Sequence, residues 1–420
     1  MKIKAIVTTT LFGLSGLLSF ALAQNNTKLI ESTSTSVKAA ISWPEEKWQQ
    51  STPSAEGIDN EVIKTYLERM RAGYFGPLDH FMLIRHGRVV AEAQFEHDYA
   101  AIYKTLGPDV IQVGVNNADL QYNYDHPDFH PYYQQSELHT LQSATKSVTS
   151  AVLGIAVDNA LIDSIDTSAM HYFKDYIFDK SDIRRAKLTI EDLLTMRSGI
   201  NWQTEGGYDD PNHSTNALES SQEWIQYTLS RPMDAEPGTV FEYNDGVSVL
   251  LGKIIREATG KRIDDYAKEH LFTPIGINDF HWKITPDGEA DTEGGLYLST
   301  HDFARFGYLF LRDGQWNGMQ VISSDWVKRS VAPTVTDIAP DNDQINDAYG
   351  YQWWVIKHQD GKPAIYEAKG FGGQRLVIVP HLDLLAVFNA WDIRGRHATP
   401  AVNAFIDEII PATKTIGVMP

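Results

Sequence analysis

The amino-acid sequence predicts an α+β protein with a mainly antiparallel sheet flanked by helices and an inserted all-helical lobe. Strand-like runs rich in β-branched and aromatic residues occur only towards the two ends of the chain, and helical periodicity fills the middle. One sheet built from both ends fits this distribution. We therefore expect an α/β lobe from residues 51–160 and 300–420 and a mostly helical lobe from residues 161–299.

The expected strands fall into an early group and a late group. The early runs flank a His86-Gly87 turn and predict a β-hairpin. The five runs are His80–Arg85, Arg88–Phe95, Gly350–Ile356, Arg375–Val379 and Leu384–Asn389.

Apolar residues at helical spacing predict the helices. Thr189 stands three residues before Asp192, which is an N-cap signature, and Gly260 is a typical helix stop. The expected helical segments are Ser54–Met70, Val148–Ile162, Thr189–Gly199, Ser220–Leu229, Val247–Thr259, Asp264–Leu271, Thr300–Leu309 and Thr399–Ile409.

Residues 1–23 are typical of a secretory signal peptide and are not expected to belong to the fold. Lys2 and Lys4 precede a mainly apolar stretch that ends in Ala21-Leu22-Ala23, so cleavage is expected after Ala23. Residues 24–50 are polar and predict a leader or linker. We expect a periplasmic or secreted protein without a stable membrane anchor, because no later stretch approaches ~20 uninterrupted apolar residues.

The net charge and the absence of cysteine exclude or disfavour several kinds of binding partner and chemistry. The formal charge is −19, and loss of Lys2 and Lys4 with the leader makes it −21. So acidic a surface disfavours nucleic acid and anionic membranes as partners. The chain has no cysteine, which excludes disulfides, thiol chemistry and a lipid-modified N-terminal cysteine.

The motif Ser143-x-x-Lys146 stands at the head of an apolar helical run and is the only such pattern in the chain. Residues three apart lie on one face of a helix, so both side chains can point at one spot. A serine hydroxyl becomes a good nucleophile when a base takes its proton, and we expect burial to lower the pKa of Lys146 enough for that role. A helix-capping serine followed by an exposed lysine would have the same sequence pattern without any catalytic role.

Two further segments carry candidate site residues. Tyr243-Asn244-Asp245 precedes the helix expected at 247–259 and can present a phenol to a cleft, although Tyr243 at a core edge and Asp245 as an N-cap would also fit. The stretch Gly370-Phe371-Gly372-Gly373-Gln374 lies just before a strand. Its glycines allow backbone to approach a ligand and free an N–H group for an oxyanion, although a simple hairpin loop is also glycine-rich.

Taken in this order, the segments resemble the serine β-lactamase and DD-peptidase superfamily, over roughly residues 80–409. Its other motifs are similar to Thr189–Gly199, Pro237–Tyr243 with Leu250-Leu251-Gly252, and Gly294-Gly295-Leu296 with Asp302-x-x-Arg305-Phe306-Gly307. The class C-like branch is most similar. It includes carboxylesterases, D-amino-acid peptidases and 6-aminohexanoate-dimer hydrolases.

The resemblance implies a serine hydrolase that cleaves an ester or amide of a small molecule without cofactor or metal. Ser143 would attack the carbonyl, and Lys146 and Tyr243 would share the base role. The N–H groups of Ser143 and Phe371 would form the oxyanion hole, and Asp245 would orient the lysine. The other substrate-binding candidates are Gly370, Gly372 and Gln374.

Two departures from the family pattern affect the expected substrate. Asp245 replaces an asparagine, and in Ala368-Lys369-Gly370 the lysine stands second where the family has a first-position cation. That cation grips a substrate carboxylate, so its absence favours a neutral ester or amide. The alternatives left open are DD-peptidase or β-lactamase activity and a non-catalytic binding member of the fold.

Aromatic residues late in the chain are candidates to line an apolar acyl pocket, although each is also a common core residue. They are Tyr351, Trp353, Trp354, Phe371 and Trp391. His126, His130 and His139 have no ligand spacing, so we expect ordinary loop histidines and no metal site.

Overall fold

The structure is a computed structural model, and it describes residues 41–106, 130–204, 210, 212–338, 346–357, 363–392 and 399–414. The expected signal peptide, most of the expected leader and His126 lie outside these ranges. Within them, no helix combines the length and the apolar character needed to cross a membrane.

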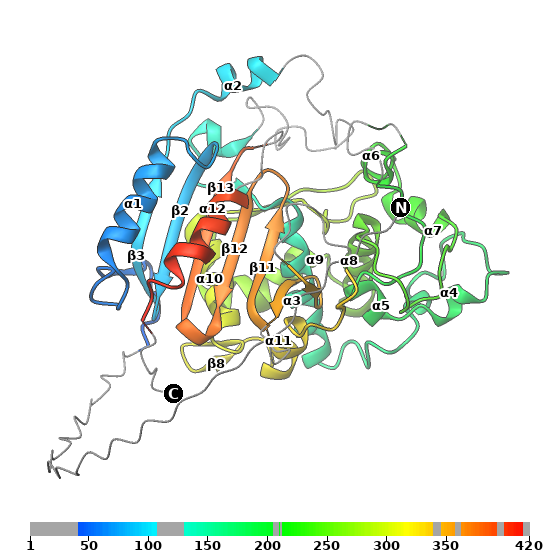
Figure 1. Cartoon of the computed structure of the whole chain (residues 1–420). Helices are drawn as coiled ribbons and strands as arrows, with labels where there is room; N and C mark the ends of the chain where they lie inside the picture. Colours follow the sequence, from blue (N-terminus) through cyan, green and yellow to red (C-terminus); the bar gives the residue numbers. More distant parts are fainter. Residues whose placement is uncertain are drawn as a thin grey trace, which may run out of the picture. The chain divides into compact units, whose positions relative to one another are not determined.

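The main sheet has eight strands in the order β1-β3-β2-β13-β12-β11-β10-β9. Its pairs are antiparallel, except that β1 runs parallel to β3. The first and last parts of the chain meet where β13 pairs with β2, as expected of a sheet assembled from both ends (Figure 1). The strands are β1 (Gln49–Gln50), β2 (Leu78–Arg85), β3 (Arg88–Gln94), β9 (Ala348–Tyr349), β10 (Trp354–Lys357), β11 (Pro363–Gly370), β12 (Gln374–Val379) and β13 (Leu384–Ala390).

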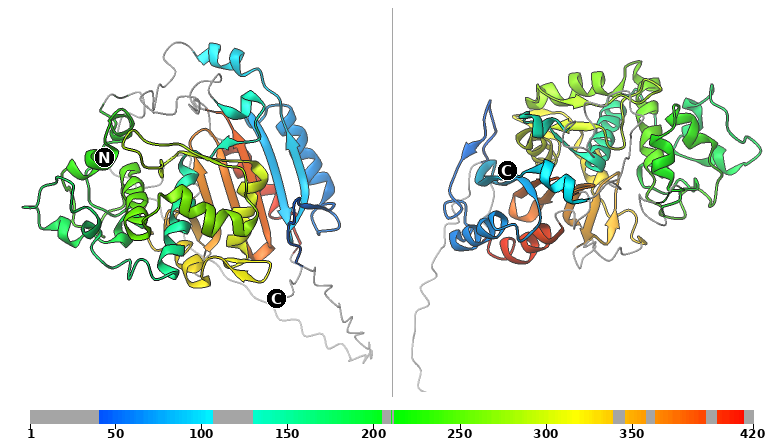
Figure 2. Two further views of the ribbon diagram at one scale, coloured as in Figure 1. Left: turned by 180° about the vertical axis from the view of Figure 1, so that it is seen from behind. Right: turned by 90° about the horizontal axis from the view of Figure 1, so that it is seen from above.

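Helices cover both faces of this sheet, so its central strands β2, β12 and β13 are buried on both sides. Successive side chains of a strand point to opposite faces. In β2, Phe81 and Leu83 join the cluster that contains Tyr66, whereas Met82 and Ile84 join the cluster that contains Val148. Seen from behind, α3 and α10 lie in front of the sheet, and α1 and α12 lie beyond it (Figure 2). These helices are α1 (Asn60–Arg71), α3 (Thr145–Asp158), α10 (Thr300–Leu311) and α12 (Thr399–Ala404).

The remaining helices come mainly from the middle of the chain. Several of them, including α4, α5 and α7, gather beyond the β11 side of the sheet (Figure 1). They are α2 (Tyr99–Leu106), α4 (Arg184–Lys187), α5 (Ile190–Leu194), α6 (Ser214–Glu219), α7 (Trp224–Ser230), α8 (Asp245–Thr259), α9 (Ile263–Ala267) and α11 (Ser324–Ser330).

Short elements complete the fold. A three-stranded sheet has the order β4-β6-β5, and β7 pairs with β8. Their bounds are β4 (His139–Thr140), β5 (His281–Trp282), β6 (Leu296–Leu298), β7 (Gln315–Trp316) and β8 (Met319–Gln320). The short turns are η2 (Pro131–Gln134), η3 (Gln142–Ala144), η4 (Ala169–Tyr172), η5 (Lys268–Phe272), η6 (Thr273–Ile275), η7 (Pro380–Leu382) and η8 (Phe405–Ile409).

Local signals in the sequence place several boundaries. The capping box of Thr189 and Asp192 starts α5, and Gly260 ends α8 in the left-handed conformation. Helix α1 begins later than expected because the Asp59 side chain caps it at the N–H groups of Glu61 and Val62. Strand β10 also begins later than expected, after a bend in which Gln352 has φ +63°.

Strand β11 was not predicted as a strand. Its sequence, PAIYEAKG, contains residues depleted in strands, among them proline, alanine, glutamate and lysine. Hydrogen bonding to β10 on one side and β12 on the other stabilises this strand despite its low intrinsic strand propensity. This strand ends beside the candidate site.

Helix α3 is buried from Thr145 to Ala156, and it packs against α11 without space for a side chain at Gly154. A Cβ atom there would lie 2.3 Å from Trp326 Cδ1, and an indole ring cannot move aside cheaply. We expect Gly154→Ala to destabilise the fold by about 1–3 kcal/mol, despite the higher helix propensity of alanine. Urea unfolding measures this change. In a Trp326→Ala background the same substitution should become neutral or stabilising, and stabilisation in the wild-type background would contradict the packing.

Candidate active site

The site is built on the turn that leads into α3. Ser143 lies in the turn η3, directly before the helix, and Lys146 lies in the first turn of α3. Gln142, immediately before the serine, has φ +46°, a conformation that non-glycine residues rarely adopt. Such backbone strain clusters at functional sites, because surrounding structure must hold it in place.

The Lys146 side chain is only 1% exposed, and oxygen atoms surround its ammonium group. Nζ donates hydrogen bonds to Ser143 Oγ at 3.0 Å, to the Glu293 carbonyl oxygen at 2.7 Å and to Glu293 Oε2 at 3.2 Å. Asp245 Oδ1 forms an ion pair with it at 2.8 Å. The lysine is therefore a buried hub that joins α3, α8 and the loop before β6.

The expectation that burial keeps Lys146 uncharged is wrong for this resting geometry. Burial does act to lower the pKa of the amine, but Asp245, Tyr243 and Glu293 outweigh it and raise the pKa well above the usual range. Two carboxylates next to one amine favour the ammonium form. At neutral pH, Lys146 donates a hydrogen bond to Ser143 and is not available as a base.

Tyr243 lies beside the serine and the lysine. Its side chain hydrogen-bonds to Ser143, and Lys146 Nζ lies 5.2 Å from the centre of its ring. Part of the side chain stays accessible, but desolvation of the hydroxyl group raises its pKa, and the charge of Asp245 adds to this against the opposing charge of Lys146. The resting tyrosine is thus a neutral phenol.

The residue after Tyr243 explains how Asp245 reaches the lysine. Asn244 Oδ1 accepts a hydrogen bond from Val247 N and caps α8, so Asp245 is not the N-cap. Asp245 is the first residue of the helix, and its other oxygen, Oδ2, accepts a hydrogen bond from Thr215 Oγ1. Burial acts to raise the pKa of Asp245, but the pairing with Lys146 and the hydrogen bond from Thr215 outweigh it and lower that pKa.

The end of β11 brings the glycine-rich segment to the same place. A Cβ atom on Gly370 would lie 2.2 Å from the Leu141 carbonyl oxygen, so only glycine lets the strand approach the segment before Ser143. Gly372 and Gly373 then turn the chain with φ +91° and +108°. Phe371, whose N–H group is the second predicted oxyanion donor, is thereby held beside the segment that carries Ser143.

Lys369 approaches the site along the same strand. Its Nζ atom lies 4.8 Å from the centre of the Trp354 ring, and that ring stacks on Tyr243 at 5.7 Å between centroids. Ala368, at the family's first position, is fully buried. The cation of this strand therefore contacts the ring that stacks on the tyrosine, and it comes from a different position than the family pattern gives.

Several predicted residues lie away from the lysine. Gln374 is fully buried, and its amide donates to the Ala390 carbonyl oxygen at 2.7 Å, so its contact with substrate stays a prediction. Trp353 packs with Phe306 and Phe310, and Tyr351 donates to Glu191 Oε1 at 2.5 Å, so neither is the pocket-lining residue that we expected. These side chains are parts of the core.

Aromatic side chains form a hydrophobic cluster around Phe371. Tyr99 and Trp391 form the centre of a small hydrophobic cluster. Phe371 packs against this cluster together with Ile102, Tyr103 and Tyr133. Of the predicted pocket residues, Trp354 stacks on Tyr243, whereas Phe371 and Trp391 belong to this cluster, so their contact with an acyl group stays a prediction.

Glu293 is a site residue that sequence reasoning missed. Asp291 Oδ1 accepts hydrogen bonds from Glu293 N at 3.1 Å and Gly294 N at 3.0 Å, and this turn aims both the carbonyl and the carboxylate of Glu293 at Lys146. Gly295 lets the turn close, because a Cβ there would lie 2.5 Å from Asp291 Cβ. The available signal was a glutamate directly before the Gly294-Gly295 motif.

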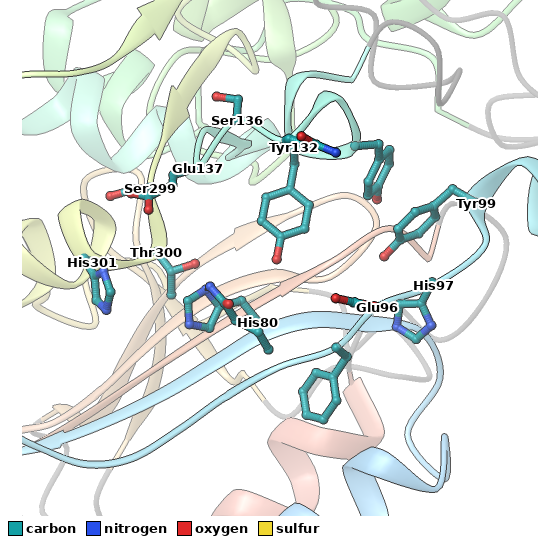
Figure 3. A pocket seen from close by; sticks show the side chains of 14 residues that line it. His80, Glu96, His97, Tyr99, Tyr132, Ser136, Glu137, Ser299, Thr300 and His301 are labelled. Atoms are coloured by element: carbon teal, nitrogen blue, oxygen red, sulfur yellow. The ribbon is translucent and has the colours of Figure 1, made fainter.

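A separate hollow lies at the ends of β2 and β3, between these strands and η2 (Figure 3). His80 Nε2 and His301 Nε2 both lie within 2.9 Å of Glu92 Oε1 beside it. Hydrogen bonds from His301 and then His80 lower the pKa of Glu92 to about 2. Ser143, Lys146 and Tyr243 are not among its described lining residues.

The histidines near the site are packed into the structure. His139 Nε2 lies 2.9 Å from Asp79 Oδ2, and His130 packs between Tyr133 and His139. Both are buried; His130 lies in the loop before η2, as expected, whereas His139 begins the short strand β4. Among the described residues, no group of three or more histidine, aspartate or glutamate side chains is arranged to hold a metal ion.

The sequence model of the beta-lactamase family matches residues 67–391, which is well over half of the chain. The chain belongs to the beta-lactamase family. This membership supports serine-hydrolase chemistry in general terms. The matched range includes the segments around Ser143, Tyr243 and Gly370.

Individual relatives agree with this family and fold. The chain is 23% identical over 284 residues to the 6-aminohexanoate-dimer hydrolase of Paenarthrobacter ureafaciens, covering 63% of this chain and 69% of that protein. The structure of a candidate 6-aminohexanoate-dimer hydrolase from Bacillus anthracis matches with TM-score 0.60 and 20% identity, and the match covers 88% of this chain and 89% of that chain. A candidate beta-lactamase from Bacteroides dorei gives TM-score 0.60 and 17% identity, covering 84% and 99%. The predicted α+β fold is confirmed.

Removal of the hub cation should destabilise the protein in a pH-dependent way. Lys146→Met leaves Asp245 and Glu293 as buried carboxylates without a cation, which should cost about 3–5 kcal/mol at pH 8. The loss should be smaller at pH 5, because the folded variant then binds protons that the unfolded chain has released. Urea unfolding at both pH values measures this difference.

Lys253→Met is the matched control for this prediction. Lys253 pairs with Glu257 at 2.8 Å and Glu289 at 3.3 Å in a partly exposed network, so its loss should cost no more than about 1 kcal/mol. Equal effects of the two substitutions would contradict a buried hub at Lys146.

Proposed function

We propose that this chain is a serine hydrolase that cleaves an ester or amide bond through an acyl-enzyme on Ser143. The observation that carries the proposal is the convergence of three groups. Lys146 Nζ lies 3.0 Å from Ser143 Oγ, and the Tyr243 side chain hydrogen-bonds to the same serine. A buried lysine next to a serine and a tyrosine has no evident use in a binding module.

The steps follow from these positions. Ser143 Oγ attacks the carbonyl carbon as its proton passes to the Lys146–Tyr243 pair. The N–H groups of Ser143 and Phe371 stabilise the oxyanion. Tyr243 and Lys146 return the proton to the leaving group, and water activated by the same pair then releases the acyl group.

The strand next to the site favours an ester or amide substrate without the carboxylate of a penicillin. Ala368 is buried where the family places a cation, and Lys369 lies against Trp354. We further propose that the protein acts in the periplasm or outside the cell, because residues 1–23 have the pattern of a cleavable signal peptide.

Covalent labelling tests this proposal. A fluorophosphonate should modify wild-type protein once, at Ser143, and Ser143→Ala should lose both the label and at least about 10³-fold of its turnover of p-nitrophenyl esters. Mass spectrometry of peptides locates the adduct. Label at another residue, or undiminished turnover in Ser143→Ala, would exclude the mechanism. Nitrocefin turnover that exceeds ester turnover would favour the β-lactamase alternative.

A further inference from the structure

The hydrogen bonds of Lys146 raise a problem for the proposed reaction. An ammonium group has three N–H donors and no acceptor. Here it donates to Ser143 Oγ, to the Glu293 carbonyl oxygen and to Glu293 Oε2, and Asp245 Oδ1 lies within 2.8 Å. In this state the lysine donates to the nucleophile and cannot take its proton. A proton must leave Nζ before the serine can be activated.

The described residues around Nζ offer three places for that proton. Tyr243 is already a neutral phenol. Asp245 is held in its ionised form, because Lys146 and the hydrogen bond from Thr215 lower its pKa against the effect of burial. Glu293 differs, since its Oε2 already accepts a hydrogen bond from Nζ at 3.2 Å, and burial, with Asp291 and Asp245, raises its pKa to about 7 against the charge of Lys146.

We propose that Glu293 accepts a proton from Lys146 and so converts the lysine into the base that activates Ser143. The inference rests on the acyl-enzyme function proposed above. It makes Glu293 a positioning residue, because it acts through the lysine and does not touch the substrate.

The proton movements balance over one acylation. An N–H bond of Lys146 breaks and an O–H bond forms on Glu293 Oε2, so ammonium and carboxylate become amine and carboxylic acid. The amine then takes the Ser143 proton while Oγ bonds to the carbonyl carbon, whose π electrons move to oxygen. When the tetrahedral intermediate collapses, Lys146 gives a proton to the leaving group through Tyr243. Glu293 then returns its proton to the amine.

The surroundings of Glu293 explain why its carboxylate can hold that proton. The charged or titratable groups that face it are Lys146 from α3, Asp245 from α8, Asp291 from its own loop and Glu219 at the end of α6. Tyr243 and Tyr349 face the same lysine and aspartate. A second buried carboxylate beside Asp245 is repelled in its ionised form, which favours proton uptake.

A purely structural role does not account for this carboxylate. Asp245 already supplies the countercharge at 2.8 Å, and the Glu293 main chain already accepts a hydrogen bond at 2.7 Å. Because the pKa of Glu293 is raised by folding, stability falls as pH rises from about 4.5, where the unfolded chain ionises, to about 7. The side chain therefore destabilises the folded protein at the pH at which it would act.

The test compares Glu293→Gln with wild type on a p-nitrophenyl ester between pH 5.5 and 8.5. Wild-type kcat/KM should fall below about pH 7, because the carboxylate must be ionised to accept the proton. Glu293→Gln keeps the main-chain contact with Nζ but should lower kcat by about 10²-fold or more, with KM within a few-fold. It should also lack the acid limb, and its thermal stability should rise relative to wild type at pH 8 but not at pH 5.

Glu289→Gln is the matched control, because Glu289 lies in the same loop but pairs with Lys253 and Arg256. It should keep the wild-type kcat and acid limb. Glu293→Asp retains a carboxylate and should keep an acid limb while recovering part of the lost kcat. If Glu293→Gln fails to fold, Glu293→Asp still decides, since loss of its acid limb would overturn the inference.

Two results would overturn this inference while the proposed function stands. One is wild-type kcat in Glu293→Gln, and the other is a reduced kcat with the acid limb still present, both with fluorophosphonate labelling of Ser143 intact. Failure of the proposed function looks different, because wild-type protein would then carry no label on Ser143.

Discussion

One buried ammonium group organises the centre of this protein. Lys146 brings together the start of α3, the start of α8 and the loop before β6 through oxygen atoms that each lie within 3.2 Å of its Nζ. A lone buried charge is expensive, so Lys146 and Asp245 each need the other in order to be tolerated in the interior. The geometry of Ser143 and Tyr243 depends on this mutual requirement, because both side chains contact or face the lysine.

The sheet supplies the rigid part of the site. Helices bury both faces of the sheet, so β11 cannot shift without disturbing two clusters of core residues. Its last residue, Gly370, packs directly on the main chain before the serine. A site placed between a rigid strand and a buried helix start is held more exactly than one placed on loops alone.

Two carboxylates at the site have a common electrostatic result. A carboxylate at Asp245 and a second at Glu293 surround one lysine, so the cluster carries more negative than positive formal charge when every group is ionised. An excess of negative charge is unfavourable in the buried interior, so the pKa of Glu293 is raised. The same carboxylates that make the lysine a poor base at rest therefore create a place for its proton.

The sequence by itself determined the distribution of strands and helices and the order of the motifs, because periodicity, caps and spacing are local properties. It also gave Ser143, Lys146 and Tyr243 as candidate site residues. The helix caps at Thr189 and Gly260 followed from the same local chemistry. Strand β11 could not be predicted from the sequence, since its residues form a strand only when β10 and β12 pair with it on either side. The charge of Lys146 and the place of Glu293 were decided by tertiary structure alone. A pKa depends on which groups meet in space, and Glu293 lies 147 residues from Lys146 in the chain.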